Sequence, residues 1–388
     1  MIAKIIKYSL LLPLNLIYFI SFLTPKKKGL WLFSSWFGEK YLDNPKYIFQ
    51  EVLKNEHNVK PYWLVKDKAL LEKLLRLGYP AVNTLSIKGF WLQLRAEAII
   101  FSHSVGTEFL SSFISPKTKR ILTWHGIPIK KIGLDNQNKK RIDKTIIMNI
   151  FLPFLKEDYD LITAVGREDK KSYHSAFKSS AKKISITGYP RNDQLFSLSN
   201  KPSANADLNI IYMPTLRGGV NSEFRLLSDG NFDFKRIDKL LMSLNAKLFI
   251  KLHPVQVFTQ RDSELIKESK NIIAILNEED IYNYLGSYDV LITDYSGIFF
   301  DFMITGKPII MAPIDYENYT KDDREVYYDY NSICPMPPCN NWDEIMKAIK
   351  LVKDNKYVTN NYYKIQRNFH KYLDKNSSLR VIDEVKKL

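Results

Sequence analysis

Two histidines in this chain directly follow apolar segments that are predicted to be buried strands. His125 comes after the segment 121–124, and His253 comes after 247–250, with Lys251 between. A neutral imidazole near its ordinary pKa can accept a proton from a hydroxyl, and a lysine or arginine side chain can meet the charge of a phosphate. These residue types therefore indicate proton transfer beside a phosphorylated ligand. The alternative is that each histidine has only a structural role.

The segment 291–313, LITDYSGIFFDFMITGKPIIMAP, predicts a strand, a turn and a helix in one continuous run. The strand ends at Thr293, Ser296 is expected to act as the N-cap of the helix, and Gly306 ends the helix. Gly297 removes side-chain bulk at the first turn, where backbone N–H groups favour negative charge. The segment is therefore expected to bind phosphate. The alternative is an ordinary strand-to-helix turn in which Ser296 only caps the helix.

Compact polar residues follow four other apolar segments in the same way. In open α/β sheets, ligands bind outside the carboxyl ends of the strands, so such residues are expected to converge on one site. Their side chains include arginine, lysine, histidine, asparagine and hydroxyl groups, and several glycines let a ligand approach the backbone. This inventory suits a phosphorylated nucleotide. The four segments are 120–131, 184–193, 209–219 and 247–254.

The motifs in these segments, taken in order, resemble those of the CDP-glycerol glycerophosphotransferase family, whose members build teichoic acids and related glycerol- or ribitol-phosphate polymers. The motifs are TWHGIPIKKIG, ITGYPRND, YMPTLRG, KLHP and DVLITDYSGIFFDF, and the N-terminal segment 29–52 is also similar to the opening segment of the family. The resemblance covers nearly the whole chain. One departure is Gly297, where the family commonly has a second serine, so a serine is expected to be tolerated there.

The resemblance implies roles for individual side chains. His125 matches the family's catalytic histidine, and we expect it to act as general base toward the acceptor hydroxyl. His253 matches the second family histidine and is expected to bind or protonate the pyrophosphate as CMP leaves, with Lys251 on the same face if the strand continues that far. The predicted donor-binding residues are Gly188, Pro190, Arg191, Asn192, Thr215, Arg217, Lys251, Asp294, Ser296, Gly297 and Asp301, and the predicted acceptor-binding residues are Gly126, Ser34 and Asn44.

These residues call for no metal and no cofactor; CDP-glycerol is the expected donor substrate. Asp294 lacks the paired-carboxylate spacing of metal-dependent transferases, and basic side chains with helix N-termini can neutralise a diphosphate. Cys334 and Cys339 have no nearby histidine or second cysteine pair, which argues against a disulfide framework and a zinc site. A reduced, cytosolic catalytic body is the simplest interpretation.

Short apolar segments alternate with helical segments along most of the chain, which is the pattern of a parallel, doubly wound α/β sheet. The alternation occurs on both sides of a polar linker candidate at 197–209. The resemblance implies two Rossmann-like domains facing a cleft, the GT-B arrangement. The predicted divisions are a hydrophobic and basic membrane-associating segment at 1–28, an acceptor-side domain at 29–198, a nucleotide-donor domain at 205–355, and C-terminal helices at 356–388 that can cross back to the first domain.

The formal net charge of +15 is concentrated in the first 200 residues. A basic domain can attract nucleic acid, anionic lipid headgroups or a polyanionic substrate. No helix-turn-helix, zinc-finger or RNP motif is recognisable in the sequence, so nucleic acid is not an expected partner. The alternative is a basic surface that serves solubility.

The N-terminal segment is hydrophobic and flanked by lysines. Residues 8–23 carry no charge and lie between Lys4, Lys7 and the lysine cluster 26–28. The run is shorter than the roughly 20 residues that cross a bilayer as a helix. We expect a peripheral or monotopic segment on the anionic cytoplasmic face of the cell membrane. A cleaved signal peptide is disfavoured because lysines occupy the cleavage region, and a helix buried against the first domain is the alternative.

Together with the resemblance, these features predict a transferase that moves glycerol phosphate from CDP-glycerol to a hydroxyl of a lipid-linked saccharide or a polyol-phosphate chain, releasing CMP. Such an enzyme serves the synthesis of teichoic acid or a related cell-surface polymer. The alternatives are transfer of ribitol phosphate from CDP-ribitol, a nucleotide-sugar glycosyltransferase of GT-B type, and a non-catalytic protein that binds the membrane surface. The sequence assigns no oligomeric state.

Overall fold

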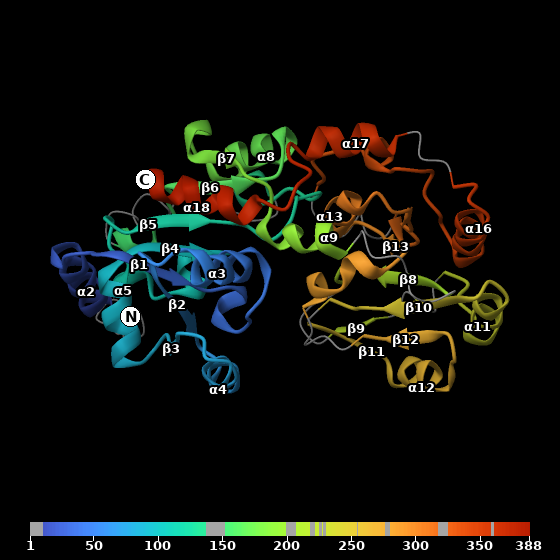
Figure 1. Ribbon diagram of the computed structural model, residues 1–388, viewed down its shortest axis with the longest axis horizontal. Helices are drawn as coiled ribbons and strands as arrows, with labels where there is room; N and C mark the ends of the chain where they lie inside the picture. The colour runs from blue at the N-terminus through green and yellow to red at the C-terminus, as the bar shows by residue number, and fades with distance from the viewer. Residues whose placement is uncertain are drawn as a thin grey trace, which may run out of the picture. The chain divides into compact units, whose positions relative to one another are not determined.

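The computed structural model describes residues 11–136, 152–198, 207–217, 222–224, 227, 230–253, 255–275, 280–316, 325–357 and 361–388 (Figure 1). The chain divides into two compact units, each with a parallel sheet of its own. Unit 1 comprises Met1–His125, Gln137–Arg191 and Asn376–Leu388, and unit 2 comprises Gly126–Asn136 and Asn192–Lys375.

Unit 1 is built on a seven-stranded sheet in the order β3-β2-β1-β4-β5-β6-β7, and every neighbouring pair is parallel. Its central strands are rich in Ile, Leu and Phe and are buried, as expected of parallel strands with both faces covered. The strand order reverses between β1 and β4, which is where open α/β sheets bind ligands. The strands are β1 (Lys27–Phe33), β2 (Lys60–Val65), β3 (Ala81–Asn83), β4 (Ala96–Phe101), β5 (Lys119–Leu122), β6 (Leu161–Ala164) and β7 (Ile184–Ile186).

The helices of unit 1 begin at polar caps and pack apolar faces on the sheet. The side chain of Asp67 accepts a hydrogen bond from the backbone of Leu70 at the start of α4, and Ser86 caps α5 through Gly89. Trp63 of β2 is fully buried in the core. The helices are α2 (Leu11–Leu23), α3 (Asp43–Asn55), α4 (Lys68–Arg76), α5 (Ile87–Arg95), α6 (Val105–Glu108), α8 (Arg167–Phe177) and α18 (Ser377–Lys387), with short 3-10 turns η1 (Trp36–Gly38), η2 (Ser111–Phe113), η4 (Pro153–Leu155) and η5 (Ala181–Lys183).

The C-terminal helix α18 belongs to unit 1, although the chain passes through unit 2 before reaching it. Its residues Val381 and Ile382 are buried in the same core cluster as the strands of the seven-stranded sheet, and the helix packs against α3. The hydroxyl of Ser185 donates a hydrogen bond of 2.6 Å to the Glu384 carboxylate. The end of the chain therefore completes the core of the first unit.

Unit 2 contains a five-stranded parallel sheet in the order β12-β10-β8-β13-β14 and a small parallel pair, β11-β9. Its strand order reverses between β8 and β13. The strands are β8 (Leu208–Met213), β9 (Ser222–Phe224), β10 (Ala246–Ile250), β11 (Gln256–Phe258), β12 (Ile272–Ala274), β13 (Val290–Thr293) and β14 (Ile309–Met311). The helices are α9 (Asp193–Leu198), α11 (Phe234–Ser243), α12 (Gln260–Glu268), α13 (Ile298–Phe302), α15 (Tyr330–Ile333), α16 (Trp342–Lys353) and α17 (Tyr362–Phe369), with 3-10 turns η3 (Gly133–Asp135), η7 (Ile281–Asn283), η8 (Leu285–Ser287) and η9 (Met303–Thr305). The 3-10 turn η6 (Pro190–Asn192) contains the point at which the chain passes from unit 1 to unit 2.

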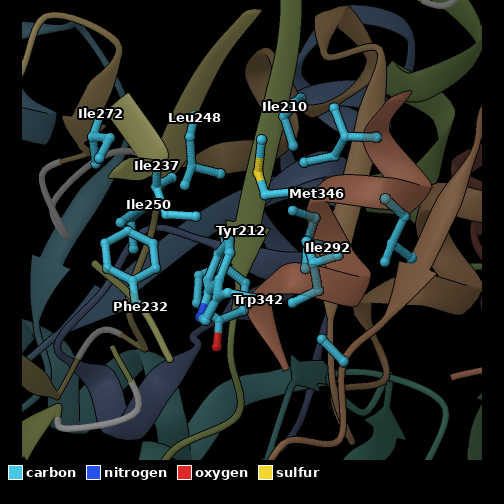
Figure 2. Packing of buried hydrophobic residues seen from close by; sticks show 14 of the residues in the cluster. Ile210, Tyr212, Phe232, Ile237, Leu248, Ile250, Ile272, Ile292, Trp342 and Met346 are labelled. Atoms are coloured by element: carbon cyan, nitrogen blue, oxygen red, sulfur yellow. The ribbon is translucent and has the colours of Figure 1, made fainter. Parts of the chain in front are cut away.

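Trp342 of α16 packs against two aromatic rings in the core of unit 2 (Figure 2). Its ring lies 5.4 Å from that of Tyr212 and 4.6 Å from that of Phe232, both nearly edge to face. Ile237 of α11 and Ile250 of β10 pack into the same cluster. Helices on the sheet thus bury the strands that present the site residues of this unit.

The observed elements confirm the predicted parallel α/β sheets but differ from the sequence-based expectations in detail. Strand β10 ends at Ile250, so it does not continue to Lys251 and His253, and the condition for these two side chains to share a strand face is not met. The three-residue strands β3, β9 and β11 were not predicted because each is too short for a period of two to be recognised.

Two segments group with unit 2 where the predicted boundary placed them in the first domain, namely Gly126–Asn136 and the residues from Asn192 to Leu198. Lys130 forms an antiparallel bridge with Val326, and the hydroxyl of Tyr327 donates a hydrogen bond of 2.7 Å to Asp135. These partners are separated by nearly 200 positions in the chain, so local composition could not predict the contacts between them.

None of the helices in the described residues is both long enough and apolar enough to cross a membrane. Helix α2 has 13 residues in the described part of the chain, and Pro13 is one of them. Several of its large apolar side chains are exposed, including Leu16, Phe19 and Leu23. The first ten residues of the expected membrane segment lie outside the described residues.

Candidate active site

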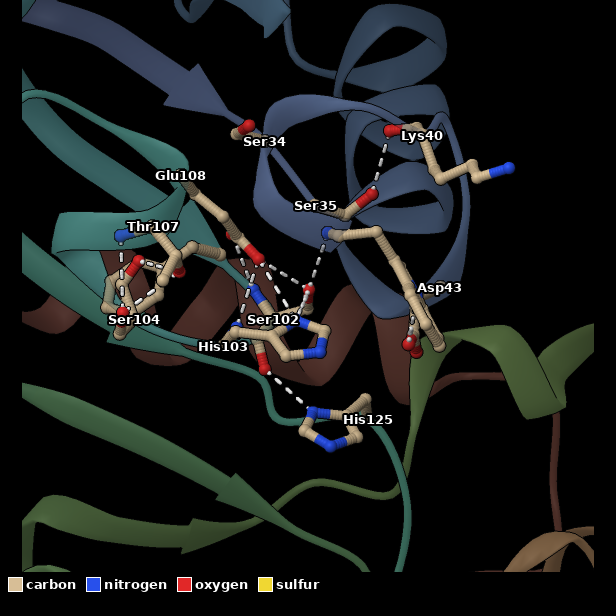
Figure 3. Close-up of polar contacts among 12 residues, drawn as sticks. Ser34, Ser35, Lys40, Asp43, Ser102, His103, Ser104, Thr107, Glu108 and His125 are labelled. Carbon is tan, nitrogen blue, oxygen red and sulfur yellow. Dashed lines mark hydrogen bonds and ion pairs between the residues drawn. The ribbon is translucent and has the colours of Figure 1, made fainter. Parts of the chain in front are cut away.

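His125 lies at the carboxyl edge of the seven-stranded sheet, two residues beyond Thr123, which continues the hydrogen bonding of β5 to Phe101. Trp124 has a left-handed backbone (φ 54°) and Gly126 has φ 141°, so the chain turns sharply on both sides of the histidine. The Nδ1 atom of His125 lies 3.1 Å from the carbonyl oxygen of Ser102 (Figure 3). Because a carbonyl only accepts, Nδ1 carries the hydrogen and Nε2 holds the lone pair.

The imidazole of His125 is held between two aromatic neighbours. The ring of His103 stacks on it with centroids 4.1 Å apart and planes at 11°, and the ring of Trp124 lies at 4.2 Å. Burial by these neighbours lowers the pKa of His125 below its ordinary value, and the adjacent His103 acts in the same direction. His125 is therefore neutral near pH 7 and can accept a proton at Nε2.

His103 is itself positioned by Glu108, a fully buried carboxyl group at the end of α6. Glu108 accepts hydrogen bonds from the backbone and hydroxyl of Ser102 at 3.0 and 2.8 Å and from the backbone of His103 at 3.1 Å, and the His103 Nδ1 lies 3.2 Å from it. Burial raises the pKa of Glu108 to about 8 and lowers the pKa of His103. This network orients the ring that stacks on His125.

Sequence reasoning missed His103 and Glu108. The signal was present, since the motif FSHSVGTEF follows the strand 96–101 in the same way that the other polar motifs follow their strands. The neighbouring carboxyl ends of β4 and β5 bring Ser102 and His103 next to His125, as parallel pairing requires.

Arg191 and Asn44 support the loop that carries His125. The guanidinium of Arg191 forms a buried ion pair with Asp43 at 2.8 Å and donates to the carbonyl oxygen of His125 at 3.0 Å. The amide of Asn44 donates to the carbonyl oxygen of Trp124 at 3.0 Å and accepts from the backbone of Arg191. All these contacts lie within unit 1 and hold the turn around His125 in place.

The predicted acceptor contacts Ser34 and Asn44 are both completely buried. The hydroxyl of Ser34 donates to the carbonyl oxygen of Leu64 at 3.1 Å. The structure therefore assigns these two side chains to the support of the site rather than to direct contact with an acceptor, because neither has surface to offer. The third residue, Gly126, contributes the turn after His125.

Gly188 and Pro190 shape the turn before Arg191. Gly188 has a left-handed backbone (φ 79°), and a side chain there would come within 2.5 Å of the Ser377 hydroxyl of α18. Pro190 begins the 3-10 turn η6. Both residues act through the backbone by directing Arg191 toward Asp43, and both are buried.

Asp294 is the centre of the polar cluster in unit 2, and it is fully buried at the end of β13. It accepts hydrogen bonds from the backbone of Thr215 at 2.9 Å and from the guanidinium of Arg217 at 2.7 Å. Arg217 also bonds the Asp315 carboxylate at 2.7 Å, and its guanidinium lies 5.2 Å from the centre of the Tyr295 ring. Thr215 and Arg217 follow β8, so the reversal of strand order between β8 and β13 brings these residues together.

The charge of this cluster matters for its chemistry. The two carboxylates of Asp294 and Asp315 share one guanidinium, and their charge raises the pKa of Arg217 although its burial opposes this. The three groups together carry more negative than positive charge. The cluster therefore suits hydroxyl or amino groups of a ligand better than phosphate, and Arg217 is less available to phosphate than the sequence suggested.

Asn192 and Asp301 are brought together in the interior of unit 2. The Asn192 amide donates to Asp301 at 2.8 Å, and the hydroxyl of Tyr282 donates to the same carboxylate at 2.6 Å. Both predicted residues are buried, at 2% and 0% exposure, so they anchor the start of α9 and the short helix α13 from within.

The turn before α13 differs from the prediction. Gly297, not Ser296, is the N-cap, and the Ser296 hydroxyl reaches the backbone of Ile298 only at 3.5 Å. A side chain at position 297 would place its Cβ 2.6 Å from the carbonyl oxygen of Ile127, another segment of unit 2. The expectation that a serine is tolerated at this position is therefore wrong, since backbone atoms at that distance cannot be displaced cheaply.

Lys251 and His253 follow β10 in irregular backbone. The backbone of Lys251 donates to the carbonyl oxygen of Tyr212 at 2.9 Å, and its side chain is nearly buried. The carbonyl oxygen of His253 accepts from the backbone of Gln256, whose amide donates to the Arg217 carbonyl oxygen at 3.2 Å. The carboxyl ends of β8, β10 and β13 thus carry three of the four predicted donor segments on one edge of the sheet.

Within the described residues, no group of three or more His, Cys, Asp or Glu side chains is arranged to hold a metal ion. Cys334 and Cys339 are both buried as free thiols.

The sequence profile described as CDP-Glycerol:Poly(glycerophosphate) glycerophosphotransferase matches residues 16–387. The chain is 30% identical over 350 residues to the teichoic acid glycerol-phosphate transferase of Staphylococcus aureus, covering 85% of this chain and 86% of that protein. It is 27% identical over 351 residues to the teichoic acid poly(glycerol phosphate) polymerase of Bacillus subtilis, covering 86% of this chain and 45% of the polymerase.

The fold is similar to that of a solved structure of the wall teichoic acid polymerase TagF, with a TM-score of 0.72 and 22% sequence identity over 99% of this chain and 96% of that one. The likeness extends to the parallel sheets of both units and confirms the α/β fold. The match of the family profile over nearly the whole length shows that the chain belongs to the CDP-glycerol:poly(glycerophosphate) glycerophosphotransferase family.

Proposed function

We propose that this chain transfers glycerol phosphate from CDP-glycerol to an acceptor hydroxyl in teichoic acid synthesis, with release of CMP. The observation that carries the proposal is the orientation of His125, whose Nδ1 faces the Ser102 carbonyl oxygen and whose Nε2 therefore holds a lone pair. The description of the family supports CDP-glycerol as the donor, and the names of the relatives support teichoic acid as the product.

In this reaction the acceptor hydroxyl gives its proton to Nε2 of His125 while its oxygen attacks the β-phosphorus of CDP-glycerol. A P–O bond forms to the acceptor, the bond from the β-phosphorus to the bridging oxygen breaks, and CMP leaves with that oxygen. Burial and the neighbouring His103 disfavour the resulting imidazolium. The negative phosphates of a bound donor oppose this effect, so donor binding strengthens the base.

The polar cluster around Asp294 is the proposed site for the nucleoside end of the donor. Support comes from the position of this cluster where the strand order of unit 2 reverses, and from its excess of carboxylates, which suit ribose hydroxyls or the cytosine amino group. His253 is proposed to bind or protonate the departing phosphate, with Lys251 beside it. The GT-B type of fold, with one Rossmann-like sheet in each unit, is likewise part of this proposal.

The proposed location is the cytoplasmic face of the cell membrane, with α2 lying on the anionic leaflet. Leu16, Phe19 and Leu23 of this helix are each about 60% exposed, at 61%, 59% and 63%. Lys27 is exposed as well and supplies positive charge beside the apolar face. Lys26 is not available for this role, because its ammonium donates to the carbonyl oxygens of Ser21 and Leu94. Burial also lowers the pKa of Lys26 to about 8.

The function is tested by incubating the purified protein with CDP-glycerol, CDP-ribitol or UDP-sugars in the presence of a lipid-linked saccharide. We expect acceptor-dependent release of CMP from CDP-glycerol. Faster release from CDP-ribitol makes the protein a ribitol phosphate transferase, and release of UDP makes it a glycosyltransferase. Absence of release from every donor contradicts a catalytic function.

A further inference from the structure

Phe37 is an exposed aromatic residue beside the candidate active site, and its backbone is strained. Its side chain is 44% exposed, and its φ of 62° lies in the left-handed region that disfavours a residue with a bulky side chain. The preceding residue, Trp36, has φ 46°. Two successive left-handed residues that are not glycine are uncommon, and such strain persists where the surrounding structure enforces it.

Several hydrogen bonds enforce this conformation. The backbone of Trp36 donates to the Ser102 hydroxyl at 3.2 Å, and its indole donates to Asp43 at 3.2 Å. The carbonyl oxygen of Gly38 accepts a hydrogen bond of 2.7 Å from the backbone of Lys66. None of these bonds buries the Phe37 side chain, so packing of the core does not explain why the strain is maintained.

The position of Phe37 relative to the proposed base is defined by the sheet. Phe37 follows β1 and His103 follows β4, the two strands between which the order of the sheet reverses. The ring of Phe37 lies 4.7 Å from the ring of His103, which stacks at 4.1 Å on His125. The exposed ring of Phe37 therefore contacts His103, and His103 in turn contacts His125, the proposed base.

We propose that Phe37 and His103 form a platform for a sugar ring of the acceptor, so that the acceptor is a saccharide rather than an open polyol-phosphate chain. This inference rests on the proposed function. The C–H face of a pyranose packs well on a flat aromatic ring, while its hydroxyls need neutral donors and acceptors such as an imidazole. An open glycerol phosphate chain has no such face and carries a negative charge on each unit.

The charges around the platform agree with a neutral ring. Arg191 is ion-paired with Asp43, and the Lys66 ammonium donates to the carbonyl oxygen of Thr107 at 2.6 Å. These two cations are thus engaged with the protein. Asp43 offsets the charge of Arg191, and burial raises the pKa of Glu108 to about 8, so these groups offer no excess of positive charge to a chain of phosphates.

The test compares Phe37→Gly and Phe37→Tyr with the wild type, using Trp91→Ala as a matched control. Glycine adopts a positive φ without strain, so Phe37→Gly is expected to fold with an unchanged or higher thermal midpoint. Trp91 is another exposed aromatic residue of unit 1, 55% exposed on α5, and lies outside the site. Each variant is assayed for CMP release with a short-chain lipid diphosphate disaccharide and, separately, with a glycerol phosphate trimer.

We expect Phe37→Gly to raise the KM for the disaccharide about tenfold or more, with a smaller change in kcat, and to have little effect on the KM for the trimer. Phe37→Tyr and Trp91→Ala are expected to resemble the wild type. An unchanged KM for the disaccharide in Phe37→Gly, or an equal rise for both acceptors, overturns the platform.

The activity of the wild type and a direct binding measurement distinguish failure of the platform from failure of the proposed function. If the wild type transfers only to the trimer, the platform is wrong while the proposed function stands. If the wild type releases CMP with neither acceptor, the proposed function fails, and the platform is judged by calorimetric titration with the disaccharide. Binding that Phe37→Gly weakens about tenfold supports the platform, and binding equal in both proteins, or absent from the wild type, overturns it.

Discussion

The imidazole of His103 lies parallel to that of His125, with ring centroids 4.1 Å apart and planes at 11°. Two cationic rings at this distance repel each other, so a positive charge on one lowers the pKa of the other. Burial lowers the pKa of His125 most and the stacked His103 adds to this effect, so the imidazole is neutral and able to accept a proton. The hydrogen bond from its Nδ1 to the Ser102 carbonyl oxygen leaves the lone pair on Nε2.

His125→Ala is expected to lower kcat by about 10²-fold or more while leaving the affinity for CDP-glycerol nearly unchanged, because the variant removes the proton acceptor and not a donor contact. The measurement is CMP release under saturating donor, with donor affinity from calorimetry. His57→Ala, at an exposed histidine in a loop of unit 1, is the matched control. Near wild-type turnover in folded His125→Ala would remove His125 from the mechanism.

His103→Phe is expected to keep the stacked ring but abolish its charge, so the pKa of His125 rises toward its ordinary value. A general base works when it is neutral, so a higher pKa moves the acid limb of the profile of kcat/KM against pH to higher pH. His174→Phe, in helix α8, serves as the control. An acid limb that stays in place in His103→Phe shows that the two rings do not influence each other's titration.

Glu108→Gln is expected to change the pH dependence of stability. Burial raises the pKa of Glu108 to about 8 in the folded protein, whereas the unfolded chain titrates near 4.5. The stabilisation from the protonated carboxyl is therefore fully present below pH 4.5 and is lost as the pH rises to about 8. The wild type should lose up to about 1.4 kcal/mol per pH unit within this window relative to the glutamine variant.

Urea unfolding of both proteins at several pH values isolates this contribution, because the titration of other buried groups is common to both. Glu72→Gln, at an exposed position of α4, controls for the loss of a carboxyl group. Parallel stability curves for wild type and Glu108→Gln would mean that the buried carboxyl does not titrate in this range.

Gly297→Ser is expected to destabilise the protein by about 1–3 kcal/mol, because its Cβ would lie 2.6 Å from the carbonyl oxygen of Ile127 and the backbone must shift. Gly106→Ala is the control, since a Cβ there meets only the end of the Ser111 side chain at 3.3 Å. The free energies of unfolding are compared by urea denaturation. A serine variant as stable as the wild type would show that this turn moves readily away from Ile127.

Lys27 and Lys28 are expected to attract the protein to anionic membranes, whereas Lys26 is already bonded within the protein. Changing Lys27 and Lys28 to Gln should weaken binding to anionic vesicles roughly tenfold or more at low salt, at about 1 kcal/mol for each lysine. The difference should shrink at physiological salt, where the Debye length is about 8 Å.

Vesicle co-sedimentation across a salt series measures this binding. Replacing the exposed Lys54 and Lys60 by Gln changes the net charge equally and is expected to have a smaller effect. Wild-type protein that stays unbound to anionic vesicles at low salt would exclude attachment through α2 and the lysines beside it.

Much of the fold and the position of His125 at a carboxyl edge could be predicted from the sequence because both depend on local patterns. Apolar runs such as 96–101 and 290–293 form strands wherever they are buried on both faces, and the polar residue that follows each run must lie at a carboxyl edge. The ordered motifs also identified the family, which the profile match over residues 16–387 confirms.

The tertiary structure alone decided which side chains meet and what each one does. Arg191 reaches Asp43 across 148 positions of the chain, and the same guanidinium donates to the carbonyl oxygen of His125 and supports that turn. Ile127 approaches Gly297 and excludes the serine that the family pattern suggested. Contacts of this kind depend on the order and register of distant strands and on the volume left between them. The local spacing of residues determines none of these quantities.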